Sequence, residues 1–183
     1  LHDLAPRHPY VLKLLARLYE SIHDWQHVIT LLPELARNHA LSTNDLQALT
    51  YRAYEGTLQH HIHHHAWDAL DTLINQLPKS LKYNPVLIAT YARALMTQHE
   101  NTRAEACLRR TLQKNVDAIL LDAYSELDAQ TIHLSAIESL LKHHTHAAAL
   151  HRCLGTLYCT QKLWGKAQVH LEQSLELEAS PET

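Results

Sequence analysis

The chain contains no phenylalanine, a single methionine, three glycines and six prolines. Glycine and proline interrupt helices, so their scarcity beside abundant leucine and alanine predicts an all-α protein. Scarce glycine also limits the chemistry, because phosphate-binding loops and nucleophile turns need glycines at fixed spacing. None of the patterns G-x-x-x-x-G-K-[ST], G-x-G-x-x-G, G-x-S-x-G or H-E-x-x-H occurs. We therefore expect no enzymatic activity and no cofactor.

Long apolar runs are absent as well. No segment approaches the roughly 20 apolar residues of a membrane-spanning helix, and no signal peptide opens the chain. The first residues, LHDLAPRHPY, lack an initiator methionine, so we expect the chain to be part of a longer protein. A net charge of −3 argues against general nucleic-acid binding. Cys107, Cys153 and Cys159 lack metal-motif clustering, and we predict reduced core thiols of a cytoplasmic domain.

The chain does contain a recurring helical spacing. Near its end, LGTLYCTQKLWGKAQVHLEQSLELEASPE places Tyr, Ala, Leu and Ser at 3, 12, 16 and 19 residues after Gly155. This is the spacing of a tetratricopeptide unit, in which two antiparallel helices approach closely at small side chains. Ala16 and Ala92 are followed by helical residues at the same offsets. One helix pair cannot bury its apolar face alone, so the pattern predicts a stack of repeats.

The predicted fold is a tetratricopeptide-type, right-handed helical solenoid of about five antiparallel helix pairs in a single repeat domain. The second repeat is lengthened by a histidine-rich stretch, and the fourth matches the spacing poorly, with Tyr124 in the place of the small residue. The repeats are predicted over residues 8–38, 43–79, 84–114, 116–146 and 148–179.

Polar residues at three predicted helix starts are typical N-caps. Asp24 precedes a helix expected to begin at Trp25, and Ser42–Asp45 resembles a capping box with Asp in the place of Glu. Asn84 and Pro85 are expected to cap and start another helix. The turn QHEN lacks the glycine often found between paired helices, and we expect Asn101 to cap the helix that follows.

Three tryptophans, Trp25, Trp67 and Trp164, each fall at the start of a repeat's second helix. A large ring at this position can fill the angle between two paired helices. We therefore predict a packing role for all three.

Several phrases together resemble one family. They are DWQHVITLLPELARNHALS, LPKSLKYNPVLIATYARALM, AEACLRRTLQKNVDAILLDAYSEL and LWGKAQVHLEQSLELEASPE. They are similar to the C-terminal tetratricopeptide region of the proteobacterial HemY proteins, and the resemblance covers nearly the whole chain. It implies an accessory or scaffold role in late haem (protoporphyrin) biosynthesis. It also implies an inner-membrane parent anchored by an N-terminal segment absent here, with the repeats on the cytoplasmic side.

Four basic residues are expected on the concave side of the solenoid, which the first helix of each pair lines. They are Lys13, Arg17, Arg93 and Arg152. Basic groups on such a wall suit an acidic peptide, a chain's C-terminus or porphyrin propionates. In the alternative interpretation, each cation pairs with an acidic residue of a neighbouring repeat. The spacing alone does not separate the two.

Histidine is unusually abundant in this chain, with 17 copies. Five of them fall in the stretch His60–His65, which we expect to be a flexible link between two helices. Neutral imidazoles bind zinc, nickel, copper or haem iron, although a dedicated site gathers ligands from separate positions. No such set is evident, and we predict no dedicated metal site.

The sequence thus favours a non-enzymatic protein-interaction scaffold that holds late tetrapyrrole-pathway enzymes near the membrane. The alternative is a carrier that binds porphyrin, haem or a divalent metal ion through His60–His65.

Overall fold

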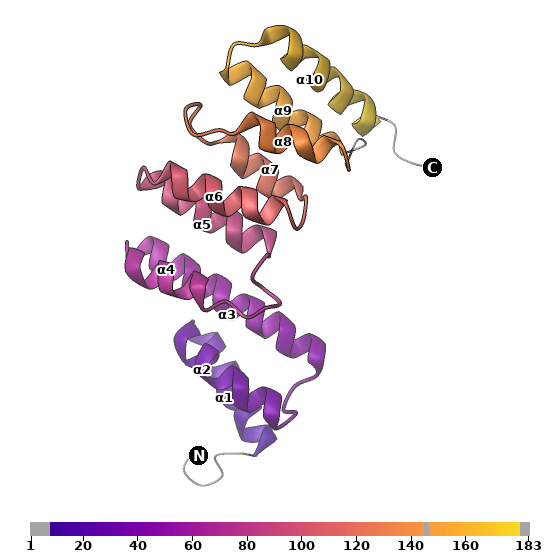
Figure 1. Cartoon of the computed structure of the whole chain (residues 1–183). Helices are drawn as coiled ribbons and strands as arrows, with labels where there is room; N and C mark the ends of the chain where they lie inside the picture. Colours follow the sequence, from indigo (N-terminus) through magenta and orange to yellow (C-terminus); the bar gives the residue numbers. More distant parts are fainter. Residues whose placement is uncertain (1–7, 145–146, 180–183) are drawn as a thin grey trace. The chain divides into compact units, whose positions relative to one another are not determined.

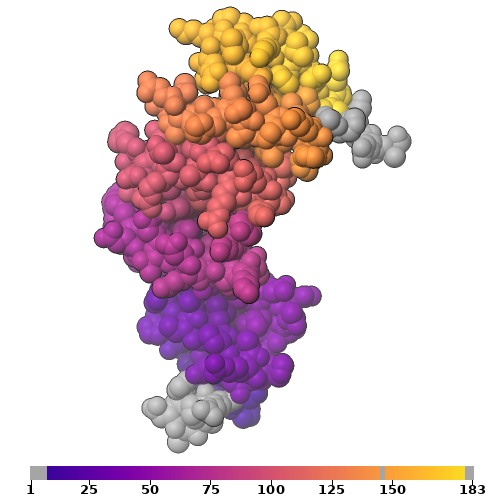
Figure 2. All heavy atoms as spheres, viewed as in Figure 1, coloured from indigo at the N-terminus to yellow at the C-terminus, as the bar shows by residue number. Residues whose placement is uncertain are grey.

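The computed structural model describes residues 8–144 and 147–179, and its regular secondary structure there consists of ten α-helices without a strand (Figure 1). The all-α fold is confirmed. The chain divides into two compact units, residues 1–82 and 83–183. Within each unit, side chains fill the spaces between the ribbons (Figure 2). The interpretation of the five predicted ranges as one repeat domain stays a prediction.

The N-terminal unit contains α1 (Pro9–Ser21), α2 (Trp25–Arg37), α3 (Thr43–His63) and α4 (Trp67–Asn75). Each helix packs against the next one along the chain. The core between α1, α2 and α3 is mostly leucine, with two alanines and one valine. Its buried members are Leu12, Ala16, Val28, Leu31, Leu32, Leu35, Leu49 and Ala53.

The C-terminal unit contains six helices, α5 (Pro85–Thr97), α6 (Asn101–Leu112), α7 (Ala118–Ser125), α8 (Leu134–Leu141), α9 (Ala148–Thr160) and α10 (Trp164–Ala179). Helix α5 packs on α6 and α7, while α9 packs on α7, α8 and α10. A Cβ atom at Gly155 would lie 2.6 Å from Cδ2 of Leu171, the residue 16 positions further on. The small residue at position 155 therefore permits the close α9–α10 contact, as the spacing predicts.

Three of the predicted N-caps are confirmed. Side-chain oxygens of Asp24, Ser42 and Asn84 accept hydrogen bonds from backbone N–H groups three residues on, at 3.1–3.3 Å. The prediction for Asn101 is wrong, because Asn101 is the first residue of α6 and Glu100 occupies the cap without a side-chain bond. The preceding turn closes through its backbone instead.

Five turns between helices share one backbone conformation. In each, the residue after the C-cap has a positive φ, and the helix end is closed by two backbone bonds of the Schellman type. After α1, for example, Asp24 N donates to Tyr19 O at 2.9 Å and His23 N to Glu20 O at 3.1 Å. Glycine usually occupies this position, and histidine is among the few other residues that tolerate it. The positive-φ residues described are His23 (56°), His39 (49°), His65 (54°), His99 (63°) and Lys162 (58°).

The tryptophans do not behave alike. Trp25 is half-buried and its indole packs on Gly56 of α3, as a packing role requires. Trp164 is 65% exposed, so the predicted role is wrong for this residue. Trp164 is the first residue of α10, and the close contact of α10 with α9 is made further along the helix, at Leu171.

Among the described residues, no helix combines the length and apolar character needed to cross a bilayer.

Candidate functional site

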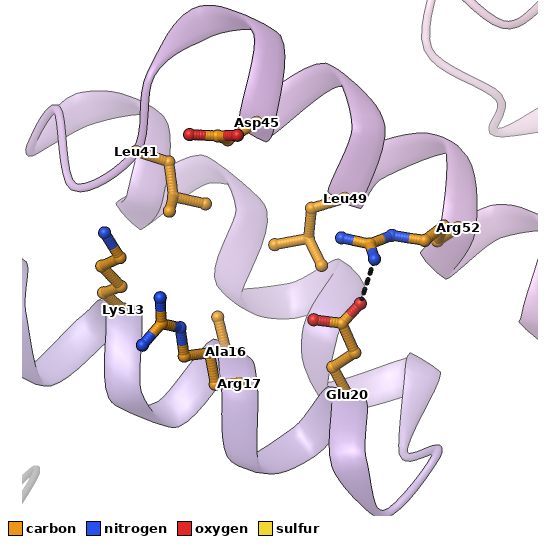
Figure 3. Close-up of a pocket in the computed structure, with 8 residues that line it drawn as sticks. All are labelled: Lys13, Ala16, Arg17, Glu20, Leu41, Asp45, Leu49 and Arg52. Atoms are coloured by element: carbon orange, nitrogen blue, oxygen red, sulfur yellow. Dashed lines mark ion pairs between the residues drawn. The ribbon is translucent and has the colours of Figure 1, made fainter.

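A hollow of about 190 Å³ opens between α1 and α3 of the N-terminal unit (Figure 3). Two of the predicted partner-binding residues, Lys13 and Arg17, line it and point into the same space. The other lining residues are Ala16 and Glu20 of α1, Leu41 of the loop before α3, and Asp45, Leu49 and Arg52 of α3.

Helix periodicity explains how both walls form. Lys13, Arg17 and Glu20 stand at i, i+4 and i+7 on α1, so they share one face of that helix. Asp45, Leu49 and Arg52 repeat the same spacing on α3. The charged side chains of the two helices therefore face each other above Ala16 and Leu49, which are buried in the core.

The charges in this groove are not balanced pair by pair. Arg52 Nη1 lies 2.8 Å from Glu20 Oε1, which joins the two walls. Asp45 accepts a hydrogen bond from the Ser42 hydroxyl at 2.7 Å as part of the α3 cap. Lys13 and Arg17 form no ion pair with any residue in the described part of the chain. The acidic groups are thus engaged, and two cations remain available to a ligand.

The other two predicted residues have acidic partners. Arg93 of α5 makes a two-pronged contact with Glu126, with Nη2–Oε1 at 2.7 Å and Nε–Oε2 at 2.9 Å. These hydrogen bonds raise the pKa of Arg93. Arg152 of α9 bonds Asp122 of α7 at 3.1 Å and Glu178 of α10 at 2.9 Å. The Arg93–Glu126 and Arg152–Asp122 contacts each join two neighbouring predicted ranges, as the alternative interpretation predicts, whereas Glu178 lies in the same predicted range as Arg152.

The histidine-rich stretch is not the flexible link that we expected. His60, His61 and His63 belong to the last turn of α3, and His64 is its C-cap. The helix continues because no glycine or proline occurs between Gly56 and His65, where the backbone takes the left-handed conformation. His61 is half-buried, and its burial, followed by the charges of His60 and His64, lowers its pKa. Over residues 8–144 and 147–179, no three His, Cys, Asp or Glu side chains converge as a metal site.

A buried polar network that the sequence did not indicate lies between α6 and α7. The Tyr124 hydroxyl donates to Glu105 Oε1 at 2.9 Å, and Arg109 Nε donates to the same oxygen at 3.0 Å. Tyr124 is fully buried and Glu105 is 2% exposed. Burial and the neighbouring carboxylate raise the pKa of Tyr124. Tyr124, at the position where other predicted repeats have a small residue, thus makes a buried hydrogen bond.

A second polar contact, which is partly buried, joins α9 and α10. The Nδ1 atoms of His151 and His170 are 3.0 Å apart. The His170 ring stacks on Tyr158 at a centroid distance of 5.4 Å, and the Tyr158 hydroxyl donates to Glu138. Burial, then the charge of His151, lowers the pKa of His170, whereas burial raises that of Tyr158 to about 12.

The cysteines are free thiols. Burial raises the pKa of Cys107 to about 11 and that of Cys153 to about 12. Neither thiol is therefore a nucleophile at neutral pH.

No protein-family model matches the chain, and no curated protein matches it.

Proposed function

We propose that this chain is a non-enzymatic protein-interaction scaffold built of tetratricopeptide-type helix pairs. Its α1–α3 groove binds a carboxylate-bearing segment of a partner protein. The observation that carries the proposal is the placement of Lys13 and Arg17 in one hollow without an acidic partner in the described part of the chain. Guanidinium and ammonium groups side by side form charge-assisted hydrogen bonds with a carboxylate.

The size and lining of the groove favour a peptide over an enclosed small molecule. Its volume of about 190 Å³ is below the roughly 300–1,000 Å³ typical of small-molecule pockets. Half-buried Leu41 offers an apolar contact next to the cations. A carboxylate held by Lys13 and Arg17 with an aliphatic side chain against Leu41 satisfies both parts of the lining.

The resemblance to the HemY repeats extends the proposal to a cellular role. In this role the chain is the repeat region of a protein anchored in the bacterial inner membrane, with the groove on the cytoplasmic side. The segment that it binds belongs to an enzyme of late haem biosynthesis. Holding such enzymes near the membrane shortens the path of a poorly soluble intermediate.

The test is binding of fluorescein-labelled acidic peptides, each prepared with a free C-terminal carboxylate and as the C-terminal amide. We expect the wild-type chain to prefer the free carboxylates, and the double variant Lys13→Glu and Arg17→Glu to bind them at least tenfold more weakly. The preference should weaken with salt, since the contact is ionic and solvent-accessible.

A matched control is the double variant Lys79→Glu and Lys82→Glu. It makes the same charge change on exposed residues of the same unit that do not line the groove. It should bind like the wild type. Equal affinity of the wild type and the groove variant, or the absence of peptide binding altogether, would contradict the proposal.

A further inference from the structure

We infer that His60 and His64 form a two-imidazole chelate for a divalent transition-metal ion of the copper, nickel and zinc class. This inference concerns the end of α3, not the residues of the α1–α3 groove. It rests on the finding that this histidine stretch is helical.

The backbone places the two rings side by side. His60 and His64 are four residues apart, and His64 N donates to His60 O at 3.0 Å, which continues the helical bonding through the pair. Residues at this spacing lie on one face of a helix. The ring centroids are 4.3 Å apart, and both residues are exposed. An ion can therefore reach both rings from solvent.

The chemistry of two imidazoles at this spacing favours borderline and soft divalent ions. Histidines at i and i+4 on a helix are a recurring zinc-binding pair, because both can direct a ring nitrogen to one ion. Imidazole also suits Cu²⁺ and Ni²⁺, and affinity among these ions is expected to be greatest for Cu²⁺. Only side-chain rotations are needed here, since the helix already fixes both backbones.

The position of the pair on the helix adds a second contribution. The C-terminal end of an α-helix carries partial negative charge on its last carbonyl groups, which favours a bound cation. His60 and His64 lie on the last turn and the C-cap of the 21-residue helix α3. A metal ion on this pair thus lies at the electronegative end of α3.

The same geometry favours a bare ion over haem. Two axial ligands of a haem iron lie on opposite sides of the porphyrin plane. Adjacent rings on one face of a helix, 4.3 Å apart, leave no space for a macrocycle between them. The pair is suited to ligands in neighbouring positions around one ion.

The experiment is calorimetric titration of the untagged chain with Cu²⁺ alone, repeated with Zn²⁺. We expect one site stronger than the remaining histidines provide, and at least a tenfold loss of its affinity in both His60→Ala and His64→Ala. Because the ion binds only the folded helix end, saturating Zn²⁺ should raise the melting temperature of the wild type but not of these variants. Amide exchange at His63 and His64 should also slow only in the wild type.

Two controls separate the chelate from adventitious binding. The variant His143→Ala with His144→Ala removes two exposed histidines that lack the i, i+4 spacing, and should keep the strong site. His63→Ala, which lies beside His64 at a ring distance of 5.0 Å, should also keep it. Affinity unchanged in His60→Ala and His64→Ala, or lost equally in His63→Ala, would overturn the inference.

Discussion

The indole of Trp25 occupies the space that a side chain at Gly56 would need. A Cβ atom built on Gly56 would lie 2.2 Å from Nε1 of Trp25. Gly56 lies inside α3, where alanine would be intrinsically favoured by up to about 1 kcal/mol. We predict that Gly56→Ala nevertheless lowers the free energy of unfolding by about 1–3 kcal/mol, the usual effect of overpacking. Chemical denaturation monitored by circular dichroism measures the change.

Gly165→Ala is the matched control, because nothing lies within 4 Å of a Cβ atom at this helical position. It should leave stability unchanged or raise it by up to about 1 kcal/mol. A Gly56→Ala variant as stable as Gly165→Ala would contradict the packing described for Trp25.

The left-handed residue after α5 offers a stabilising substitution. His99 has φ 63° and is exposed, and a left-handed L-residue costs about 1–2 kcal/mol that glycine largely avoids. Because glycine also adds freedom to the unfolded chain, we predict a net gain of about 0.5–1 kcal/mol for His99→Gly. The β-branched variant His99→Val should be destabilised. Thermal denaturation of the two variants beside the wild type is the measurement, and a less stable His99→Gly would contradict the prediction.

The α6–α7 network should contribute measurably to stability. Tyr124→Phe removes the donor to Glu105 and the acceptor of His133 N, and both partners remain in place. We predict a loss of about 1–3 kcal/mol, since it removes a hydrogen bond from a buried carboxylate. The control is Tyr51→Phe. In the wild type, the half-buried Tyr51 hydroxyl donates to Glu55 at 3.0 Å, and we expect its removal to lower the free energy of unfolding by about 0.5 kcal/mol. Equal losses in urea denaturation would show that burial of the network has no effect.

The α9–α10 contact should make the chain less stable in mild acid. The pKa of His170 is lowered from 6.5 in the folded chain, so the unfolded chain binds more protons just below that pH. Stability contributed by this group is therefore present above pH 6.5 and is lost as the pH falls towards the folded pKa. The charged groups facing it are His151, which opposes protonation, Glu138, which favours it, and Lys166, which opposes it.

We predict that His170→Gln loses less stability than the wild type between about pH 7.5 and pH 5. The control His143→Gln, at an exposed position, should follow the wild type. Unfolding free energies across this range give the slopes. Parallel slopes for His170→Gln and the wild type would contradict the assignment.

Local patterns predicted the helices well because their causes lie within a few residues. Asp24 caps α2 through an N–H three residues away, and Gly155 lies against Leu171 of the next helix, 16 residues further on. The composition of the histidine stretch resembles that of a loop, but no glycine or proline lies between Gly56 and His65, so α3 continues to His63.

The groove could be predicted only in part. Helical spacing predicts that Lys13 and Arg17 share one face, but it does not indicate that Arg52 lines the same groove, because Arg52 comes from another helix. The acids that engage Arg93 and Arg152 lie 26–33 residues away in sequence. A pattern of short offsets does not reveal such partners, so it could not distinguish the two free cations from the two paired ones.

The Schellman turns bear on how the chain reaches its fold. Each joins two helices through bonds that span five residues or fewer, and most helices pack on a neighbour in sequence. Contact order within each unit is therefore low, and proteins of this kind form their native topology in microseconds to milliseconds. A nascent chain needs only one completed hairpin of helices to begin burying leucine, before distant segments have been synthesised.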